Sequence, residues 1–178
     1  MSGDSFPLNL PLTRFATDGR EATTLFRELH NPLLRYLAGL GLPAEEAQDV
    51  VQDAFLSLHK HLTGGGSQQN IRSWLFRVAH NRARNFQQSY ARRFGEPLDP
   101  VFDAASPDVT PEQAMLAKEK FHRLDQAIRS LAVQERECLM LRAEGLRYRE
   151  IAGVLGISLG SVANSMARAI ERLTGGAV

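Results

Sequence analysis

Apolar side chains recur every three or four residues along most of the chain, which is the spacing of amphipathic helices. In the first half, this spacing predicts helices over Ala22–Leu40 and Pro43–Leu62, separated by a glycine-containing turn. A third helical stretch is predicted from Asn70 to about Phe94, with a break near Asn81. The first half should therefore form a small bundle of amphipathic helices.

The second half begins after a segment without helical periodicity. Residues 95–110 are rich in proline and acidic side chains, which is typical of an interdomain linker. Helices are predicted beyond it over Pro111–Leu131 and Val133–Ala143, and a further helical pair follows. Strand-like alternation and internal repeats are not evident. The pattern predicts an all-α fold with two small helical domains, 20–94 and 111–175, and an N-terminal extension of residues 1–19.

The segment 147–162 is typical of a helix-turn-helix. Its first helix has an apolar stripe of Ile151, Ala152 and Leu155, and Gly156 permits the sharp bend that follows. An ordinary αα-hairpin is the alternative interpretation, but the mutually consistent offsets of these residues favour a DNA-binding motif.

The sequence contains no recognisable metal-ligand cluster and no nucleophile in an activating context. The 178 residues are 43% hydrophobic and 23% charged, enough for one or two small domains with their own cores. The single cysteine, Cys138, can form neither a disulfide nor a cysteine zinc cluster within one chain. His59 and His61 lie two positions apart on a helix, which does not place them on one metal-binding face. We expect no catalytic residue, no metal and no cofactor.

The sequence also predicts a cytoplasmic protein without membrane insertion. The N-terminus has no basic residue before Arg14, unlike a secretory leader. No segment approaches the roughly 18 consecutive apolar residues of a transmembrane helix.

Charges are segregated along the chain, although the net charge is only +1. No acidic residue lies between Ala54 and Gly95, whereas lysine and arginine accumulate there. The pattern inverts between Phe94 and Ala117, where acidic residues occur without any lysine or arginine. This distribution indicates a basic block joined by an acidic linker to a mixed C-terminal block.

Within the basic block, polar side chains recur along one face of the third predicted helix, at spacings of four, three, four and four. They are Arg77, Asn81, Arg84, Gln88 and Arg92. Guanidinium groups suit phosphates, and amides can contact base edges, so this stripe predicts a nucleic-acid surface. A solvated helix face is the alternative, and the absence of nearby acids favours the functional interpretation.

The second predicted helix carries Asp49, Gln52 and Asp53 at positions i, i+3 and i+4, on one outward face. A catalytic carboxylate pair would need a confined, desolvating pocket, which an amphipathic surface helix does not provide. A protein-docking surface is the better prediction.

Taken in order, three segments resemble bacterial sigma factors, specifically the small extracytoplasmic-function group. Residues 49–56, DVVQDAFL, are similar to the family's polymerase-docking helix, and residues 73–81, SWLFRVAHN, are similar to its promoter-melting segment. The helix-turn-helix resembles the family's promoter-recognition motif. The resemblance covers about residues 22–175.

The resemblance implies a dissociable subunit that binds core RNA polymerase and promoter DNA. Polymerase contacts would fall to Asp49, Gln52, Asp53 and Phe55. The stripe from Arg77 to Arg92 would hold the melted single strand of the −10 element, with one base flipped out near Asn81. The C-terminal recognition helix would enter the major groove of the duplex −35 element, and the acidic linker would thread through the polymerase.

This chain departs from the family pattern in the recognition helix. Ala163, Ser165 and Ile170 occupy positions where family members usually carry basic residues. Fewer phosphate contacts would weaken −35 binding and flatten its salt dependence. The −35 contacts are therefore assigned to Arg147, Arg149, Ser161, Asn164, Ser165 and Arg168.

Two alternatives stay open at this point. A sigma-mimic adaptor would keep the fold and sequester an anti-sigma factor, which is a further candidate partner, without binding promoters. A stand-alone helix-turn-helix regulator would explain only the C-terminal domain.

Overall fold

The computed structural model describes residues 19–100 and 110–175, which contain helices and no strand. The helices are α1 (Gly19–Gly39), α2 (Ala44–Thr63), α3 (Ile71–Phe94), α4 (Pro111–Arg129), α5 (Val133–Ala143), α6 (Tyr148–Leu155) and α7 (Leu159–Gly175). The all-α prediction is confirmed. In the described part of the chain, no single helix has the length and apolarity of a bilayer span; α6 and α7 meet that test only as a pair, across a bend of 106°.

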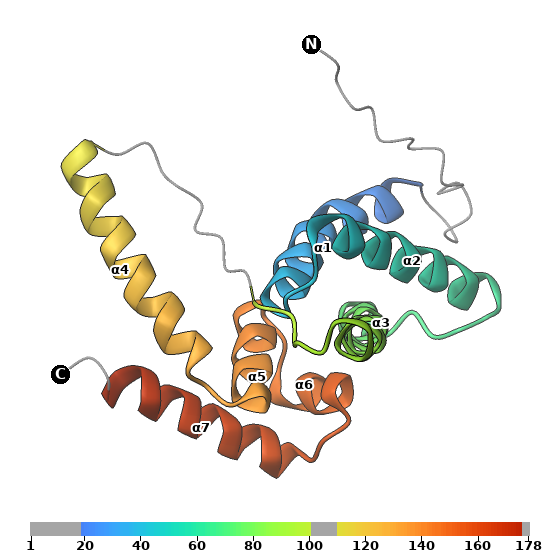
Figure 1. Ribbon diagram of the computed structural model, residues 1–178. Helices are drawn as coiled ribbons and strands as arrows, with labels where there is room; N and C mark the ends of the chain where they lie inside the picture. The colour runs from blue at the N-terminus through green and yellow to red at the C-terminus, as the bar shows by residue number, and fades with distance from the viewer. Residues whose placement is uncertain (1–18, 101–109, 176–178) are drawn as a thin grey trace.

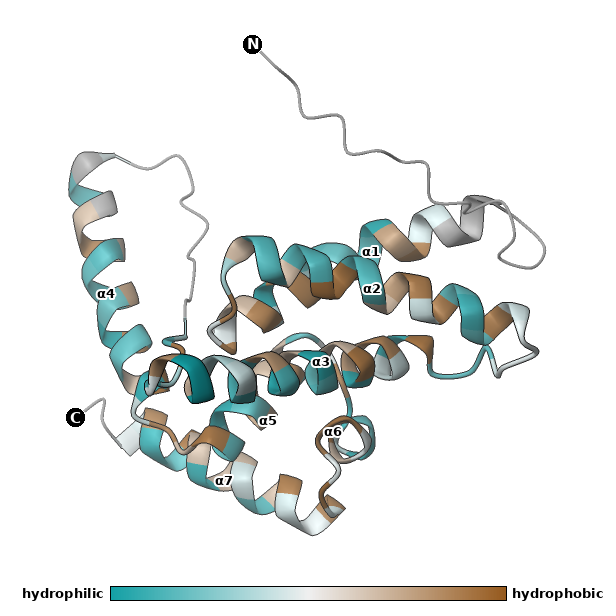
Figure 2. Cartoon of the chain, turned by 45° about the vertical axis from the view of Figure 1, so that its right-hand side comes forward, coloured by the Kyte–Doolittle hydropathy of each residue, from teal (hydrophilic) through white to brown (hydrophobic). Residues whose placement is uncertain are grey.

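Helix α3 lies at the centre of the fold. Figure 2 shows it crossing the molecule between α1 and α2 on one side and α5 to α7 on the other. Figure 1 shows α4 leaving this body at an angle, with α7 running below it. We refer to α1–α3 as the N-terminal unit and to α4–α7 as the C-terminal unit.

One apolar cluster runs through both units. From the N-terminal unit it includes Leu37, Leu75 and Phe76, and from the C-terminal unit Leu141 and Ile151, all fully buried. Burying a side chain of this size contributes about 1.5–3 kcal/mol. The two units therefore share a hydrophobic contact.

Local sequence signals explain where several helices begin. The Thr110 hydroxyl accepts a hydrogen bond from the Gln113 amide at the start of α4, which is half of a capping box. At the start of α6, the backbone amide of Arg147 donates to Glu150 Oε2 at 2.7 Å. Gly95 ends α3 in the left-handed conformation that glycine adopts readily.

Helix α3 is continuous through Asn81, so the predicted break there is wrong. Asparagine has a low helix propensity, but Ala79 and Ala83 are both fully buried on either side of it. Packing on the same face above and below Asn81 therefore outweighs the local preference.

The predicted domain boundaries stay predictions. Helices α1–α3 and α4–α7 fall largely within the ranges 20–94 and 111–175. The expected N-terminal extension lies almost entirely outside the described residues, as does the linker between 101 and 109.

The part of the linker that is described packs on the turn between α1 and α2. Gly41 in this turn has φ +90°, and a Cβ atom there would lie 2.9 Å from both the Asp99 carbonyl oxygen and the Leu98 Cβ. Pro100 is buried in the same segment. Gly41 is thus required both by its backbone conformation and by the close approach of the linker.

We predict that Gly41→Ala lowers the free energy of unfolding by about 2–3 kcal/mol, because left-handed strain adds to a steric clash. Gly65→Ala is the matched control, because Gly65 has φ +81° but no atom within 4 Å of the added Cβ. It should cost only the strain, about 1–2 kcal/mol. Urea denaturation measures both; equal losses would show that the linker does not pack on this turn.

Candidate nucleic-acid interface

The predicted basic stripe forms one exposed face of α3. Arg77, Asn81, Arg84, Gln88 and Arg92 are all exposed. The opposite side of the helix is anchored in the core by Leu75, Phe76, Ala79 and Ala83. Arg92 and Arg93 occupy the last turn, where cations interact favourably with the helix dipole. A rigid, anchored helix therefore presents cations and amides at regular spacing.

On α2, Asp49, Gln52 and Asp53 are exposed together, as the spacing predicted. Asp53 accepts a hydrogen bond from Arg82 at 2.8 Å, a surface ion pair between α2 and α3. Such an exposed pair contributes at most about 1 kcal/mol and leaves the carboxylate available to a partner.

Phe55 does not belong to this surface. Its side chain is 4% exposed and its ring lies 4.8 Å from the ring of Phe26, between α2 and α1. The assignment of Phe55 as a polymerase contact is therefore corrected: it supports α2 from inside the core.

Helices α6 and α7 form the predicted helix-turn-helix. Gly156 ends α6 with φ +68°, which permits the bend into α7. The Ser161 amide donates to Ser158 Oγ at 3.1 Å, which caps the beginning of α7. Val162 and Met166 are buried against the rest of the unit. The motif is well anchored, so its exposed face can serve as a rigid recognition surface.

Asn164 and Arg168 lie on the exposed face of α7, and Ser161 is half-buried at its start. Ser165 is 5% exposed, and its hydroxyl accepts a hydrogen bond from Gln134 Nε2 of α5 at 2.8 Å. The assignment of Ser165 as a DNA contact is corrected, because its hydroxyl is directed to α5 and not to solvent.

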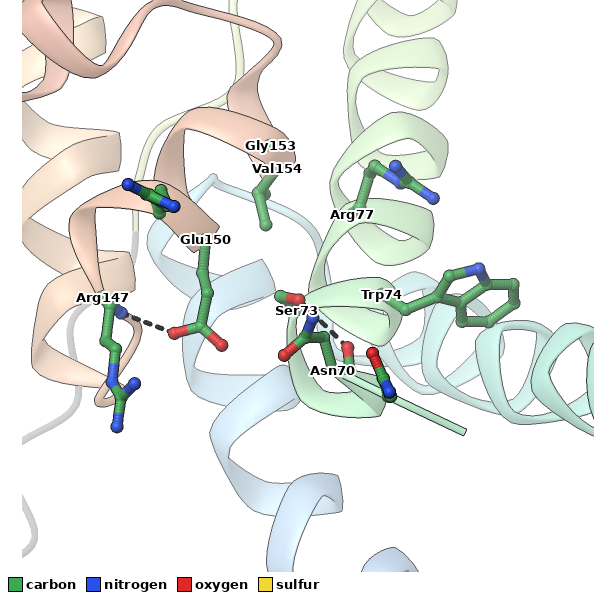
Figure 3. Close-up of a pocket in the computed structure, with 10 residues that line it drawn as sticks. Asn70, Ser73, Trp74, Arg77, Arg147, Glu150, Gly153 and Val154 are labelled. Carbon is green, nitrogen blue, oxygen red and sulfur yellow. Dashed lines mark hydrogen bonds between the residues drawn. The ribbon is translucent and has the colours of Figure 1, made fainter. Parts of the chain in front are cut away.

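The remaining two candidates for −35 contact, Arg147 and Arg149, lie at the start of α6 and not on α7. They line a cleft of about 480 Å³ between α6 and α3, together with Arg77. In Figure 3, Glu150 extends from α6 toward the start of α3, where Ser73 Oγ donates to the Asn70 carbonyl. Residues expected in two separate binding sites are thus brought to one cleft.

Ion pairs also link the two units. Arg35 of α1 donates to both carboxylate oxygens of Glu144, from Nε at 3.0 Å and from an Nη at 2.8 Å. Arg84 of α3 lies 3.6 Å from Glu137 of α5. The Arg35–Glu144 pair spans 109 residues of sequence, and no motif or spacing signals it.

Beside these pairs is a buried polar contact between α1 and α3. The Tyr36 hydroxyl shares a hydrogen bond of 2.8 Å with His80 Nδ1. Burial lowers the pKa of His80 to about 4, and the nearby Arg84 guanidinium acts in the same direction. Burial raises the pKa of Glu137, and Arg84 and Arg136 partly oppose that rise. His80 is therefore neutral at pH 7.

Comparisons with known proteins identify the family. The family model "Sigma-70 region 2" matches residues 25–93, and "Sigma-70, region 4" matches residues 121–173. The RNA polymerase sigma-H factor of Pseudomonas aeruginosa is 32% identical over 88% of this chain and 86% of its own length. The chain belongs to the sigma-70 family, in its extracytoplasmic-function (ECF) group, and is an RNA polymerase sigma factor. Sigma factors are transcription regulators and not enzymes.

Other relatives agree. The RNA polymerase sigma factor YlaC of Bacillus subtilis is 30% identical over 82% of this chain and 85% of its own length. The solved structure of CnrH in complex with the cytosolic domain of CnrY has 25% identity and a TM-score of 0.60, over 88% of this chain and 87% of that one. The Bartonella quintana sigma factor RpoE, in complex with the anti-sigma factor NepR, has 19% identity and a TM-score of 0.67, over 88% of this chain and 96% of that one, which supports the fold.

The low pKa of His80 gives a pH prediction. In the unfolded chain this histidine is protonated below about pH 6.5, whereas in the folded chain it stays neutral down to about pH 4. The free energy of unfolding should fall by about 3 kcal/mol over that range. The raised pKa of Glu137 acts in the opposite sense, because it stabilises the folded chain as the pH falls. The test therefore compares variants with the wild-type chain. His80→Gln should reduce the fall in unfolding free energy between pH 6.5 and 4, and His122→Gln, at an exposed histidine, should leave that fall unchanged. If urea denaturation gave the same pH dependence for His80→Gln as for the wild-type chain, the low pKa assigned to His80 would be wrong.

Proposed function

We propose that this sigma factor docks on core RNA polymerase through α2, holds the melted −10 strand on α3, and contacts the −35 element through α6 and α7. The observation that carries the proposal is the exposed stripe on α3, which presents three arginines and two amides on an acid-free helix. Phosphate contacts from arginine fix a strand in place, and amides add hydrogen bonds to bases.

The −10 role fits the physical requirements of a melted strand. A flipped base costs a few kcal/mol, which must be offset by contacts made outside the duplex. Asn81 lies in the middle of the stripe with arginines on both sides, so a strand held by its phosphates would pass over this amide. This geometry supports Asn81 as the group that contacts an extruded base.

The −35 role is proposed for a reduced set of residues. The exposed polar face of α7 offers Asn164 and Arg168, and Arg147 and Arg149 add cations at the start of α6. Arg172 is engaged with Glu135 at 3.6 Å. We expect fewer phosphate contacts than a fully basic recognition helix would make, and therefore a shallow salt dependence.

Partners follow from the same proposal. Core polymerase and promoter DNA are the two required partners, and the CnrH and RpoE structures, solved with CnrY and with the anti-sigma factor NepR, support an anti-sigma factor as a third. We infer a cytoplasmic protein that needs no catalytic residue, metal or cofactor.

One observation favours a second function, that of a sigma mimic which sequesters an anti-sigma factor. With Ser165 buried and Ala163 in place of a basic residue, α7 has few groups for DNA. In vitro transcription with purified core polymerase and a promoter library separates the two. Defined start sites with shared upstream elements support the sigma factor; polymerase binding without initiation would support the mimic.

For the polymerase surface, we predict that Asp49→Ala combined with Gln52→Ala weakens binding to core polymerase about tenfold or more, because truncations within a docking patch remove central contacts. Fluorescence anisotropy of the labelled chain measures the affinity. Glu28→Ala, which removes an exposed acid from α1, should leave it unchanged. An unaltered affinity in the double variant would refute the docking surface.

For the −35 contacts, replacing Arg147, Arg149 and Arg168 by alanine should weaken promoter binding by the holoenzyme. The slope of log affinity against log salt should become shallower by about 0.9 for each phosphate that is no longer neutralised. Lys118→Ala with Lys120→Ala is the control, since both lysines are exposed on α4. Promoter affinity that survives the triple replacement would exclude these arginines.

A further inference from the structure

The cleft between the start of α3 and α6 gathers three arginine side chains. Its volume is about 480 Å³, and Arg77, Arg147 and Arg149 line it. All three are exposed to solvent. Among the described residues none of the three forms an ion pair, whereas Arg35 and Arg123 elsewhere in the chain do. A cleft lined by cations of this kind raises the local concentration of anions.

Two of these arginines lie where α6 begins. Arg147 is the N-cap residue of α6, and Arg149 lies in its first turn. The positive end of the helix dipole therefore adds to the charge of both guanidinium groups. The strongest attraction for a negative group is on the α6 side of the cleft, with Arg77 on the α3 side.

One acid also lies in the cleft. Glu150 is half-buried, and its Oε2 accepts a hydrogen bond of 2.7 Å from the backbone amide of Arg147. Figure 3 shows Glu150 between Arg147 on the α6 side and Arg77 on the α3 side. Three cations and one carboxylate give the lining a formal charge of +2 at pH 7. A phosphate monoester, with a charge of about −1.5 to −2, would balance it.

The rest of the polar lining suits a ligand that carries both donors and acceptors. Gln69, Asn70 and Ser73 contribute amide and hydroxyl groups from the loop before α3 and from its first turn. The carboxylate of Glu150 is an acceptor only, so it suits a hydroxyl or an amine of the ligand. The arginines are donors only and suit phosphate oxygens. The cleft thus favours a phosphate joined to a group that can donate.

Two residues of α6 leave room for a ring beside these polar groups. Gly153 has no side chain, and a Cβ atom added there would meet no atom within 4 Å. Val154 is 3% exposed and adds an apolar surface to the lining. On the α3 side, Trp74 also lines the cleft, and its ring is stacked on that of His61 with 4.9 Å between their centroids. Apolar and aromatic surface in a charged cleft is typical of a site for a ring-containing ligand.

We propose that this cleft binds a nucleotide. Its phosphates lie against Arg147 and Arg149, a ribose hydroxyl or a base amine donates to Glu150, and the base lies beside Gly153. The volume of the cleft falls within the range of roughly 300–1,000 Å³ that small-molecule sites occupy. Arginine suits phosphate because its planar guanidinium donates two parallel hydrogen bonds. Inorganic phosphate would use the cations but not the acceptor, so the mixed lining favours a nucleotide.

The site has two consequences. A ligand that contacts α3 and α6 together binds the folded chain and not the unfolded one, so it raises the midpoint of thermal unfolding. The three arginines are also proposed to contact promoter DNA, so a bound nucleotide would compete with DNA for them. This second consequence rests on the proposed function, whereas the site itself does not.

The ligand class is tested by isothermal titration calorimetry of the full chain. The probes are ATP, GTP, CTP and UTP, each without magnesium, and inorganic phosphate. We expect at least one nucleotide to bind saturably, one molecule per chain, and at least about tenfold more tightly than inorganic phosphate. If no nucleotide bound more tightly than phosphate, the cleft would be an unselective anionic surface contact, and the proposal would be overturned.

The role of the arginines is tested by charge reversal. Arg149→Glu should weaken nucleotide binding at least about tenfold, because it places a like charge against the phosphates. Arg27→Glu makes the same change at an exposed position of α1 outside the cleft and should bind the nucleotide as the wild-type chain does. Circular dichroism verifies that both variants keep their helices. Equal affinities for the two variants would contradict the site.

A second variant fills the cleft without changing its charge. Gly153→Leu places a side chain in open space, and leucine favours a helix more than glycine does, so the fold should be retained. Gly160→Leu on α7 is the matched control, since its Cβ would meet only Ser158 Oγ at 3.9 Å. Gly153→Leu should lose at least about tenfold in nucleotide affinity and Gly160→Leu should lose none. A nucleotide that bound Gly153→Leu normally would occupy another site.

Phosphates of a DNA strand have the same chemistry as those of a free nucleotide. A short fluorescein-labelled single-stranded DNA of randomised sequence separates the two sources. We expect Gly153→Leu to bind this strand as the wild-type chain does, although it has lost the nucleotide. If the variant lost the strand and the nucleotide equally, the cleft would belong to the path of the DNA, and a separate nucleotide site would be excluded. If the nucleotide bound and the strand did not bind even the wild-type chain, the site would stand and the −10 assignment would fail.

Discussion

The position of α3 between two layers of helices is the constraint on which the rest of the structure depends. One side of the helix is held by the buried side chains of Leu75, Phe76, Ala79 and Ala83. Another side contacts α6, and only the remaining surface carries the arginines and amides that suit a DNA strand. Anchoring on one side makes the exposed groups rigid, which favours specific contact over a flexible basic tail.

The charges around α3 follow from the same position. The helix contains no acid, so its arginines find counter-charges on neighbouring helices: Arg82 on Asp53 of α2, and Arg84 on Glu137 of α5. A surface suited to phosphates thus also attracts the acids of its own chain. The Arg82–Asp53 pair is exposed and therefore weak, so a phosphate can replace the carboxylate at little cost.

Periodicity and turn chemistry were sufficient to predict the helices and the helix-turn-helix, because both are local properties of the sequence. The break expected at Asn81 was wrong because packing by Ala79 and Ala83 is a tertiary effect. Ser165 and Phe55 were assigned by analogy with the family's motifs. Their spacing from buried neighbours, such as Val162 and Leu58, was a signal that both face inward.

The contact between the units could not be predicted from the sequence. Arg35 and Glu144 are an ordinary arginine and an ordinary glutamate until folding brings them together across 109 residues. Likewise, Arg147 and Arg149 were expected on the first helix of the motif, where they lie, but nothing in the sequence signalled that they line a cleft together with Arg77. Long-range pairs of this kind depend on how whole helices pack.

The measurement that tests the central claim most directly is site-specific crosslinking in an open promoter complex, with a photoreactive residue placed at Asn81 of α3 or, as a control, at the exposed Gln48 of α2. The account predicts crosslinks from position 81 to the melted −10 strand and none from position 48. The absence of crosslinks to that strand from position 81 would contradict it.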